Sequence, residues 1–233
     1  MGGVVGLVGS GEVSSGVESI DRELLAATGR KRPRVAVVPT AMAPRGEAQF
    51  ARTCELGRQH FAALGAEVEA VALRNRADAD DAALAQAIGE ADVIWLSGGV
   101  PDYLHRVLTG TAAEAALWAA FHRGAVVAGC DAGAAVLGGH RFVLRRRPWP
   151  LRWLLGLGLV PGAAVAPHYD TLPEPVMLVS LLRAPSGEAV VGIDARTALV
   201  GRDGHWQVQG LGRVTVWRGR QRSRYRDGDA LQL

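Results

Sequence analysis

An apolar run, a tight turn of small residues and the start of a helix follow one another from Ala125 to Gly139, in the sequence AVVAGCDAGAAVLGG. Small residues on both sides of a central position are typical of the strand-to-helix elbow that displays a nucleophile at the edge of a parallel sheet. The central residue of this elbow is Asp131. The N–H of the next residue, Ala132, would point to where an oxyanion forms. The sequence therefore predicts a nucleophile elbow that carries a carboxylate.

Two other segments carry groups that such an elbow would use. Ser97, Gly98 and Gly99 join a predicted strand to a predicted helix, and paired glycines let backbone N–H groups approach a developing negative charge. His168, in the segment VAPHYD, follows an apolar stretch and could supply a base. A lone histidine or a lone Ser-Gly-Gly turn is more often structural than catalytic, so each gains weight from the other and from the elbow.

A carboxylate at the elbow leaves two interpretations open. A carboxylate attacks alkyl carbon or phosphorus, and a histidine can then activate water to split the covalent ester. Attack of Asp131 on a peptide carbonyl would instead form a mixed anhydride and expel a poor amine leaving group. In the second interpretation, which we favour, Asp131 lies at the positive end of the helix that follows. Its carboxylate would accept the N–H groups of Gly99 and Ala132, pair with His168 and close the site. Cys130 precedes the apex, so we expect it to face the core.

The elements that must position these groups alternate between strands and helices. Nearly continuous apolar runs are typical of strands buried on both faces of a parallel sheet, and five such runs cover Gly3–Gly9, Arg34–Thr40, Glu67–Leu73, Asp92–Gly99 and Ala125–Cys130. Helical patterns with apolar stripes, acidic first turns or glycine stops separate them. The alternation predicts a doubly wound, mostly parallel α/β fold with three α/β/α layers, whose ligands bind beyond the carboxyl ends of the strands.

The pattern changes after Arg141. A stretch rich in Trp, Arg and Pro leads to a helix-like EPVMLVSLLRAP, which is followed by the short apolar segments AVVGID, TALVGR, HWQVQG and RVTVWRG. Turn signals at Asp203-Gly204 and at residues 210–212 predict antiparallel strands, as a meander or hairpins on the sheet edge. No linker marks off a second domain, so we expect residues 1–233 to form one domain.

Composition excludes several classes of protein. The 233 residues are 48% hydrophobic and 21% charged, as in ordinary globular domains. No apolar run approaches the ~20 residues of a membrane span, and the first residues lack the basic start of a signal peptide. Cys54 and Cys130 lie far apart and fit no metal spacing. We therefore expect reduced thiols, a cytoplasmic location, no membrane contact, and no metal or other cofactor.

The basic residues are almost all arginine, since Lys31 is the only lysine. They concentrate at residues 141–153 and 218–226. Such patches can bind nucleic acid, but no recognised nucleic-acid motif accompanies them. We expect arginine-rich solvated faces and no nucleic-acid partner.

The ordered segments VGSGE, VVPTA, LSGG, AGCDAGAAV, GLGLVPG, PHYD and GIDARTALV resemble the dipeptidase E and cyanophycinase family of serine peptidases, in the class I glutamine amidotransferase-like superfamily. The resemblance implies a flavodoxin-like α/β/α domain, often dimeric, that cleaves small or acidic peptides without a metal. It aligns the nucleophile serine of the family with Asp131 and the histidine with His168. The oxyanion hole would consist of the backbone N–H groups of Gly99 and Ala132.

The chain departs from this family pattern at two of the three triad positions. Asp131 replaces the nucleophile serine, and the glutamate that often orients the histidine aligns with Ala195. Asp194 could stand in for that glutamate, but along a strand it would face away from Ala195. Asp170 is close to His168 in sequence only. Removing a triad nucleophile costs orders of magnitude in rate, so we expect a homologue that lacks serine peptidase activity and binds a small peptide, an acidic small molecule or a partner, with a homodimer as one assembly.

Two other hypotheses come from the same residues. The chain could be an active hydrolase that uses Asp131 as a nucleophile, or as a base acting through water, with assistance from His168. Alternatively, its arginine-rich surface could bind acidic peptides or nucleic acid, with Arg145–Arg147 meeting acidic groups near the cleft.

Overall fold

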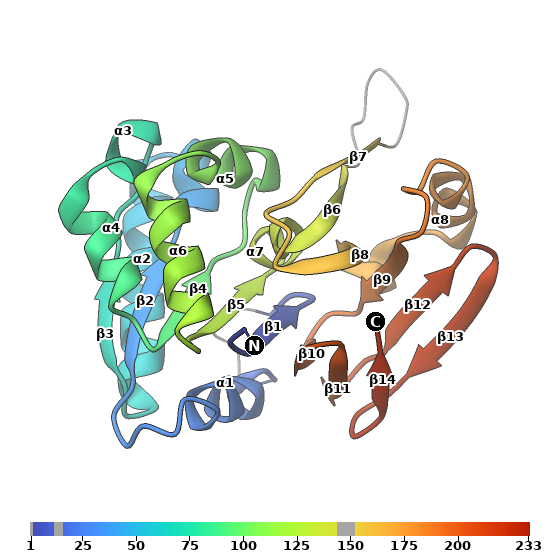
Figure 1. Ribbon diagram of the computed structural model, residues 1–233, viewed down its shortest axis with the longest axis horizontal. Coiled ribbons are helices and arrows are strands. Elements are labelled where there is room, and N and C mark those ends of the chain that lie inside the picture. Colours follow the sequence, from blue (N-terminus) through green and yellow to red (C-terminus); the bar gives the residue numbers. More distant parts are fainter. Residues whose placement is uncertain (1, 12–15, 144–151) are drawn as a thin grey trace.

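The computed structural model describes residues 2–11, 16–143 and 152–233. Its framework is an eight-stranded sheet in the order β14-β11-β10-β1-β5-β4-β2-β3 and a six-stranded sheet in the order β13-β12-β9-β8-β6-β7. Figure 1 shows β2, β3 and β4 among helices on one side of the molecule and the β12–β13 hairpin on the other. No helix among the described residues is both long and apolar enough to cross a bilayer.

Five adjacent parallel strands form the first sheet from β1 to its edge at β3. They are β1 (Val5–Val8), β2 (Arg34–Val38), β3 (Glu67–Ala70), β4 (Val93–Leu96) and β5 (Val126–Cys130). With β2 counted as the first strand, the run β3-β2-β4-β5 has the order of a flavodoxin-like sheet, and the N-terminal strand β1 takes the fifth place beside β5. The predicted parallel α/β fold is therefore confirmed.

Helices cover both faces of this sheet, as the three-layer prediction required. Their bounds are α1 (Glu18–Ala26), α2 (Glu47–Ala63), α3 (Arg76–Ala79), α4 (Ala82–Gly89), α5 (Pro101–Leu108), α6 (Ala112–His122) and α7 (Ala132–Leu137). Because successive side chains of a strand point to opposite faces, β4 places Trp95 in the core beneath α1 and α2. There Trp95 meets the ring of Phe61 edge-on at 5.3 Å. Its neighbours Ile94 and Leu96 join the opposite core, beneath α4, α5 and α6.

The C-terminal half differs in part from the expected edge meander. The first sheet is indeed extended by β10 (Thr197–Arg202), β11 (His205–Gly210) and β14 (Ala230–Gln232). Strand β10 pairs antiparallel with β1, and each later strand pairs antiparallel with the one before it. A second sheet, which the sequence did not indicate, contains β6 (Gly138–Val143), β7 (Arg152–Leu155), β8 (Val160–Pro167), β9 (Ala189–Ile193), β12 (Val214–Arg218) and β13 (Gln221–Tyr225). Helix α8 (Glu174–Leu181) packs on it through Met177, beside Trp217 and Phe142.

Candidate functional site

The turn from β5 into α7 forms the predicted elbow. Asp131 has φ 48° and ψ −108°, a conformation that costs a non-glycine residue energy and is often found at functional sites. A Cβ on Gly133 would lie 2.1 Å from the carbonyl oxygen of Leu96, and a Cβ on Gly129 would lie 2.3 Å from the carbonyl carbon of Gly133. Both positions therefore require glycine, and their close packing holds the Asp131 side chain at the carboxyl end of β5.

The Asp131 carboxylate lies between the other two predicted segments. Its Oδ2 accepts a hydrogen bond from the N–H of Gly99 at 3.1 Å, and its Oδ1 lies 3.3 Å from Nε2 of His168. Gly99 has φ 136°, and a Cβ there would lie 2.4 Å from the carbonyl oxygen of Ala41, so this position too requires glycine. Ala132 is buried, and the carboxylate does not cap the helix that starts there. Of the two expected backbone donors, Gly99 is the one that the carboxylate engages.

His168 reaches this point from β8, on the second sheet. Its backbone is left-handed (φ 51°, ψ 37°), and its N–H donates to the carbonyl of Gly9 at 3.3 Å, which ties it to the end of β1. The hydrogen bond to Asp131 raises the pKa of His168 above its ordinary value. Partial burial acts against this rise, and the charges of Asp131 and Asp170 add to it. The imidazolium is therefore favoured, and a protonated ring cannot accept a proton from a nucleophile.

The residues around Ala195 provide no carboxylate for the second nitrogen of His168. Asp170 Oδ1 accepts the N–H of Ala195 at 2.9 Å, and Asp194 Oδ2 accepts the N–H of Arg213 at 3.0 Å. Within the described part of the chain, neither carboxylate is hydrogen-bonded to His168. Burial, followed by the nearby charge of Asp170, raises the pKa of Asp194 despite the hydrogen bond from Arg213. Each carboxylate instead accepts a backbone N–H from a segment distant in the sequence, at Ala195 and at Arg213.

A cavity of about 530 Å³ opens over the Asp131–His168 pair. Its lining consists of Ser10, Gly11, Met42, Arg45, Gln49, Gly98, Gly99, Cys130, Asp131 and His168. The site is thus open, and the carboxylate occupies one backbone donor without filling the cleft. Arg45 and Gln49, both exposed, were missed by the sequence analysis. They follow β2, and their position beyond the carboxyl end of a parallel strand was the available signal.

Comparison with known proteins identifies the family of this chain. A profile of peptidase family S51 matches residues 5–209. The chain belongs to peptidase family S51. It is similar to the cyanophycinase of Trichormus variabilis, with 32% identity over 164 residues, which are 67% of this chain and 55% of that protein. A cyanophycinase of Synechococcus elongatus is 31% identical over 157 residues, which are 64% of this chain and 49% of its own length. The chain spans about half the length of these curated relatives.

Two solved structures resemble this S51 chain along nearly its whole length. A peptidase from an acI-B1 Actinobacterium superposes with a TM-score of 0.88 at 30% identity, covering 100% of this chain and 98% of the other. A putative peptidase E protein from Listeria monocytogenes gives a TM-score of 0.66 at 18% identity, covering 91% and 100%. The second likeness concerns the fold alone.

The remaining residues that the sequence singled out take no part in the contact between Asp131 and His168. Cys130 lines the cavity but is only 1% exposed and belongs to the core, as expected. Arg141 corrects the expectation of a solvated basic face: it is 4% exposed, and its guanidinium Nη2 lies 2.9 Å from Oδ1 of Asp102. Arg145–Arg147 fall outside the described residues. The described residues include no cluster of three metal-ligating side chains.

Proposed function

We propose that this S51 chain no longer hydrolyses amides and instead binds a small peptide or acidic small molecule in its cleft. One observation carries the proposal: the Asp131 carboxylate accepts the N–H of Gly99 while it contacts His168. In a serine peptidase that N–H would stabilise the oxyanion of the tetrahedral intermediate. Here the donor already faces a negative charge.

Electrostatic repulsion between the Asp131 carboxylate and an oxyanion disfavours acyl transfer. An oxyanion about 4 Å from the Asp131 carboxylate would be repelled by about 1 kcal/mol in water and by about 4 kcal/mol at the lower dielectric of a protein surface. The nucleophilic hydroxyl is missing as well, and loss of a triad nucleophile removes orders of magnitude in rate. Both effects raise the free energy of the transition state of hydrolysis. The cleft itself stays open and can still bind a ligand.

The lining of the cleft favours a ligand with a carboxylate. Arg45 is exposed and makes no ion pair with any described residue. It lines the cavity, and its guanidinium can bind a carboxylate with two parallel hydrogen bonds. Ser10 and Gln49 line the same cavity and can bond the amide groups of a short peptide. An acidic dipeptide combines these features.

The test of lost activity compares the native chain with its variants on an aspartyl-leucine dipeptide, with release of free amino acid as the readout. We expect no turnover above background by the native chain. Asp131→Ser restores the nucleophile, and with Ala195→Glu it also restores the residue that orients His168, so the double variant should gain measurable hydrolysis over either single variant. Turnover by the native chain that Asp131→Asn abolishes would contradict the proposal.

The test of binding uses calorimetry with the same dipeptide. Arg45→Gln should weaken binding by up to about fivefold, because an exposed charge contributes up to about 1 kcal/mol. Arg52→Gln, an exposed arginine of α2 outside the cavity, is the matched control and should bind as the native chain does. Equal affinities of all three proteins would remove the role given to Arg45.

The 3.3 Å approach of Asp131 to His168 also supports a second candidate, a hydrolase in which Asp131 attacks an alkyl or phosphoryl centre and His168 then activates water. For an alkyl substrate in heavy-oxygen water, hydrolysis of the covalent ester at its carbonyl carbon would place the label in the Asp131 carboxylate. Mass spectrometry of the peptide that contains Asp131 detects that label. An unlabelled peptide despite turnover of an alkyl substrate would exclude the alkyl-ester route.

A further inference from the structure

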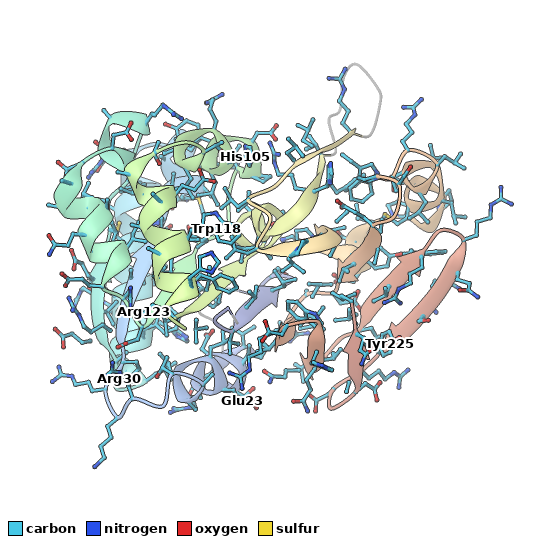
Figure 2. All side chains as sticks on the ribbon, in the orientation of Figure 1. Glu23, Arg30, His105, Trp118, Arg123 and Tyr225 are labelled. Carbon is cyan, nitrogen blue, oxygen red and sulfur yellow. The ribbon has the colours of Figure 1, made fainter. Side chains whose placement is uncertain are left out.

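A second cavity, of about 380 Å³, lies at the opposite end of β1 from Asp131. Four apolar side chains that line it are almost fully buried: Val5, Leu159, Val160 and Trp206, with exposures of 2%, 6%, 3% and 6%. Trp118 and Phe121 of α6 also line it, with their rings edge to face at 5.8 Å; Trp118 is labelled in Figure 2. The volume is within the range of small-molecule pockets, which runs from about 300 to 1,000 Å³.

This cavity is separate from the Asp131 cleft. Strand β8 has Val160 at the second cavity and leads to His168 at the first. It contains eight residues, which span about 23 Å or more at ~3.3 Å per residue. Strand β10 likewise ends at the second cavity with Arg202. A ligand in one cavity therefore does not touch the other.

The lining of the second cavity favours a ligand that carries an apolar group. Aromatic rings provide large apolar surfaces that also hold another ring in offset or edge-to-face geometry. Trp206 adds a buried indole, 6% exposed, to the two rings of α6. The three rings together favour a ligand with a bulky apolar group.

The rim of the cavity carries two opposite charges side by side. Arg202 and Asp203 form part of the tight turn between β10 and β11, where Arg202 pairs with His205 in the ladder. Asp203 and Gly204 both have positive φ, 50° and 82°, as in the rigid two-residue turns of β-hairpins. Both charged side chains are exposed, and neither makes an ion pair with a described residue. The guanidinium and the carboxylate of these neighbouring lining residues match the carboxylate and ammonium of a zwitterion.

We propose that this second cavity binds the zwitterion of an α-amino acid with a bulky apolar side chain. The side chain packs among Trp118, Phe121 and Trp206. Arg202 holds the carboxylate and Asp203 holds the ammonium group. The proposal does not depend on what the Asp131 cleft does.

The experiment is calorimetric titration of the full chain with L-phenylalanine and two analogues that each lack one charge. Phenethylamine lacks the carboxylate and phenylacetate lacks the ammonium group. We expect L-phenylalanine to bind more tightly than either analogue by about three- to fivefold, because exposed ion pairs contribute up to about 1 kcal/mol each. Arg202→Gln should abolish the preference over phenethylamine. Asp203→Asn should abolish the preference over phenylacetate, and asparagine tolerates the left-handed turn.

Three further variants define the location. Trp118→Ala should weaken the binding of all three compounds, since it removes a wall of the cavity. Arg220→Gln, an exposed arginine outside the cavity, should leave every affinity unchanged. His168→Gln should also leave them unchanged, which separates this site from the Asp131 cleft. Absence of binding, equal affinity of the native chain for the three compounds, or loss of binding in His168→Gln would each overturn the proposal.

Discussion

Asp131 and His168 form an ion pair across the two sheets, with Oδ1 and Nε2 separated by 3.3 Å and with 31% and 44% of their side chains exposed. In a serine peptidase the corresponding imidazole must be neutral, because it takes the proton of the hydroxyl. A carboxylate in place of the hydroxyl favours the protonated ring instead. The carboxylate at the elbow therefore leaves less of the imidazole in the neutral form that can accept a proton.

The first prediction concerns the source of the raised pKa of His168. Asp131→Asn keeps the shape of the side chain and removes its charge, so the pKa of His168 should fall toward its ordinary value, because the hydrogen bond to Asp131 is the largest cause of the rise. An NMR titration of the ring protons measures the change. A His168 curve that stays in place in Asp131→Asn would mean that the pair is not its cause.

The second prediction follows from linkage between this pKa and folding. Because the folded state raises the pKa of His168 above about 6.5, the folded chain holds the proton more tightly than the unfolded chain. The stabilisation is fully present below about pH 6.5 and is lost as the pH rises through the folded-state pKa. The two side chains are partly exposed, so the contribution should be a few tenths to about 1 kcal/mol.

Urea unfolding at pH 6 and pH 8.5 measures this contribution. The free energy of unfolding of the native chain should exceed that of His168→Gln by more at pH 6 than at pH 8.5. An equal difference at the two pH values would show that the ion pair does not stabilise the fold.

The third prediction concerns a second Asp–His pair, buried between α1 and α2. Oδ2 of Asp21 lies 2.7 Å from Nε2 of His60, and their side chains are 1% and 13% exposed. Burial raises the pKa of Asp21, although His60 counteracts it, and Oδ1 of Asp21 has no partner among the described residues. His60→Ala would leave a buried carboxylate unpaired, which costs about 3 kcal/mol or more.

Thermal and urea unfolding of His60→Ala measure that loss. The double variant Asp21→Leu/His60→Ala removes the charge as well and should recover part of the lost stability, because an apolar pair of similar volume replaces buried charge at little cost. If the single variant were as stable as the native chain, the pair would contribute nothing to packing of α1 against α2.

The parallel core was predictable because its strands carry a strong local signal. Val93–Leu96 and Val126–Cys130 are continuous apolar runs that end in glycine-containing turns, and such runs are typical of strands covered on both faces. The second sheet gives a weaker signal. Its strand β8 consists of Pro, Gly, Ala and Val, without the alternation or β-branched bulk that marks a strand. Arg141 of β6 suggested solvent exposure because its partner, Asp102, lies 39 positions earlier. A pairing over that distance leaves no pattern in the sequence.

The candidate site was predictable where its residues lie in recognisable turns after strands. Asp131, Gly99 and His168 each follow a strand within a recognisable turn, so the sequence placed them at one edge. Arg45 carries only the weak signal of its position after β2, and Trp206 carries none, because a tryptophan within a strand is ordinary. Their neighbours, and hence the two cavities, follow only from the tertiary structure.

The last prediction tests the packing that holds the elbow. Gly133→Ala would place a Cβ 2.1 Å from the carbonyl oxygen of Leu96, and backbone on both sides prevents relief, so we expect a loss of several kcal/mol of stability. Gly89→Ala is the matched control: it lies at the end of α4, where a Cβ would make ordinary contact with Ala116 at 3.6 Å, and it should be neutral or stabilising by up to about 1 kcal/mol. Urea unfolding distinguishes the two, and equal stability would mean that the elbow tolerates a side chain because the backbone of α7 can move away from β4.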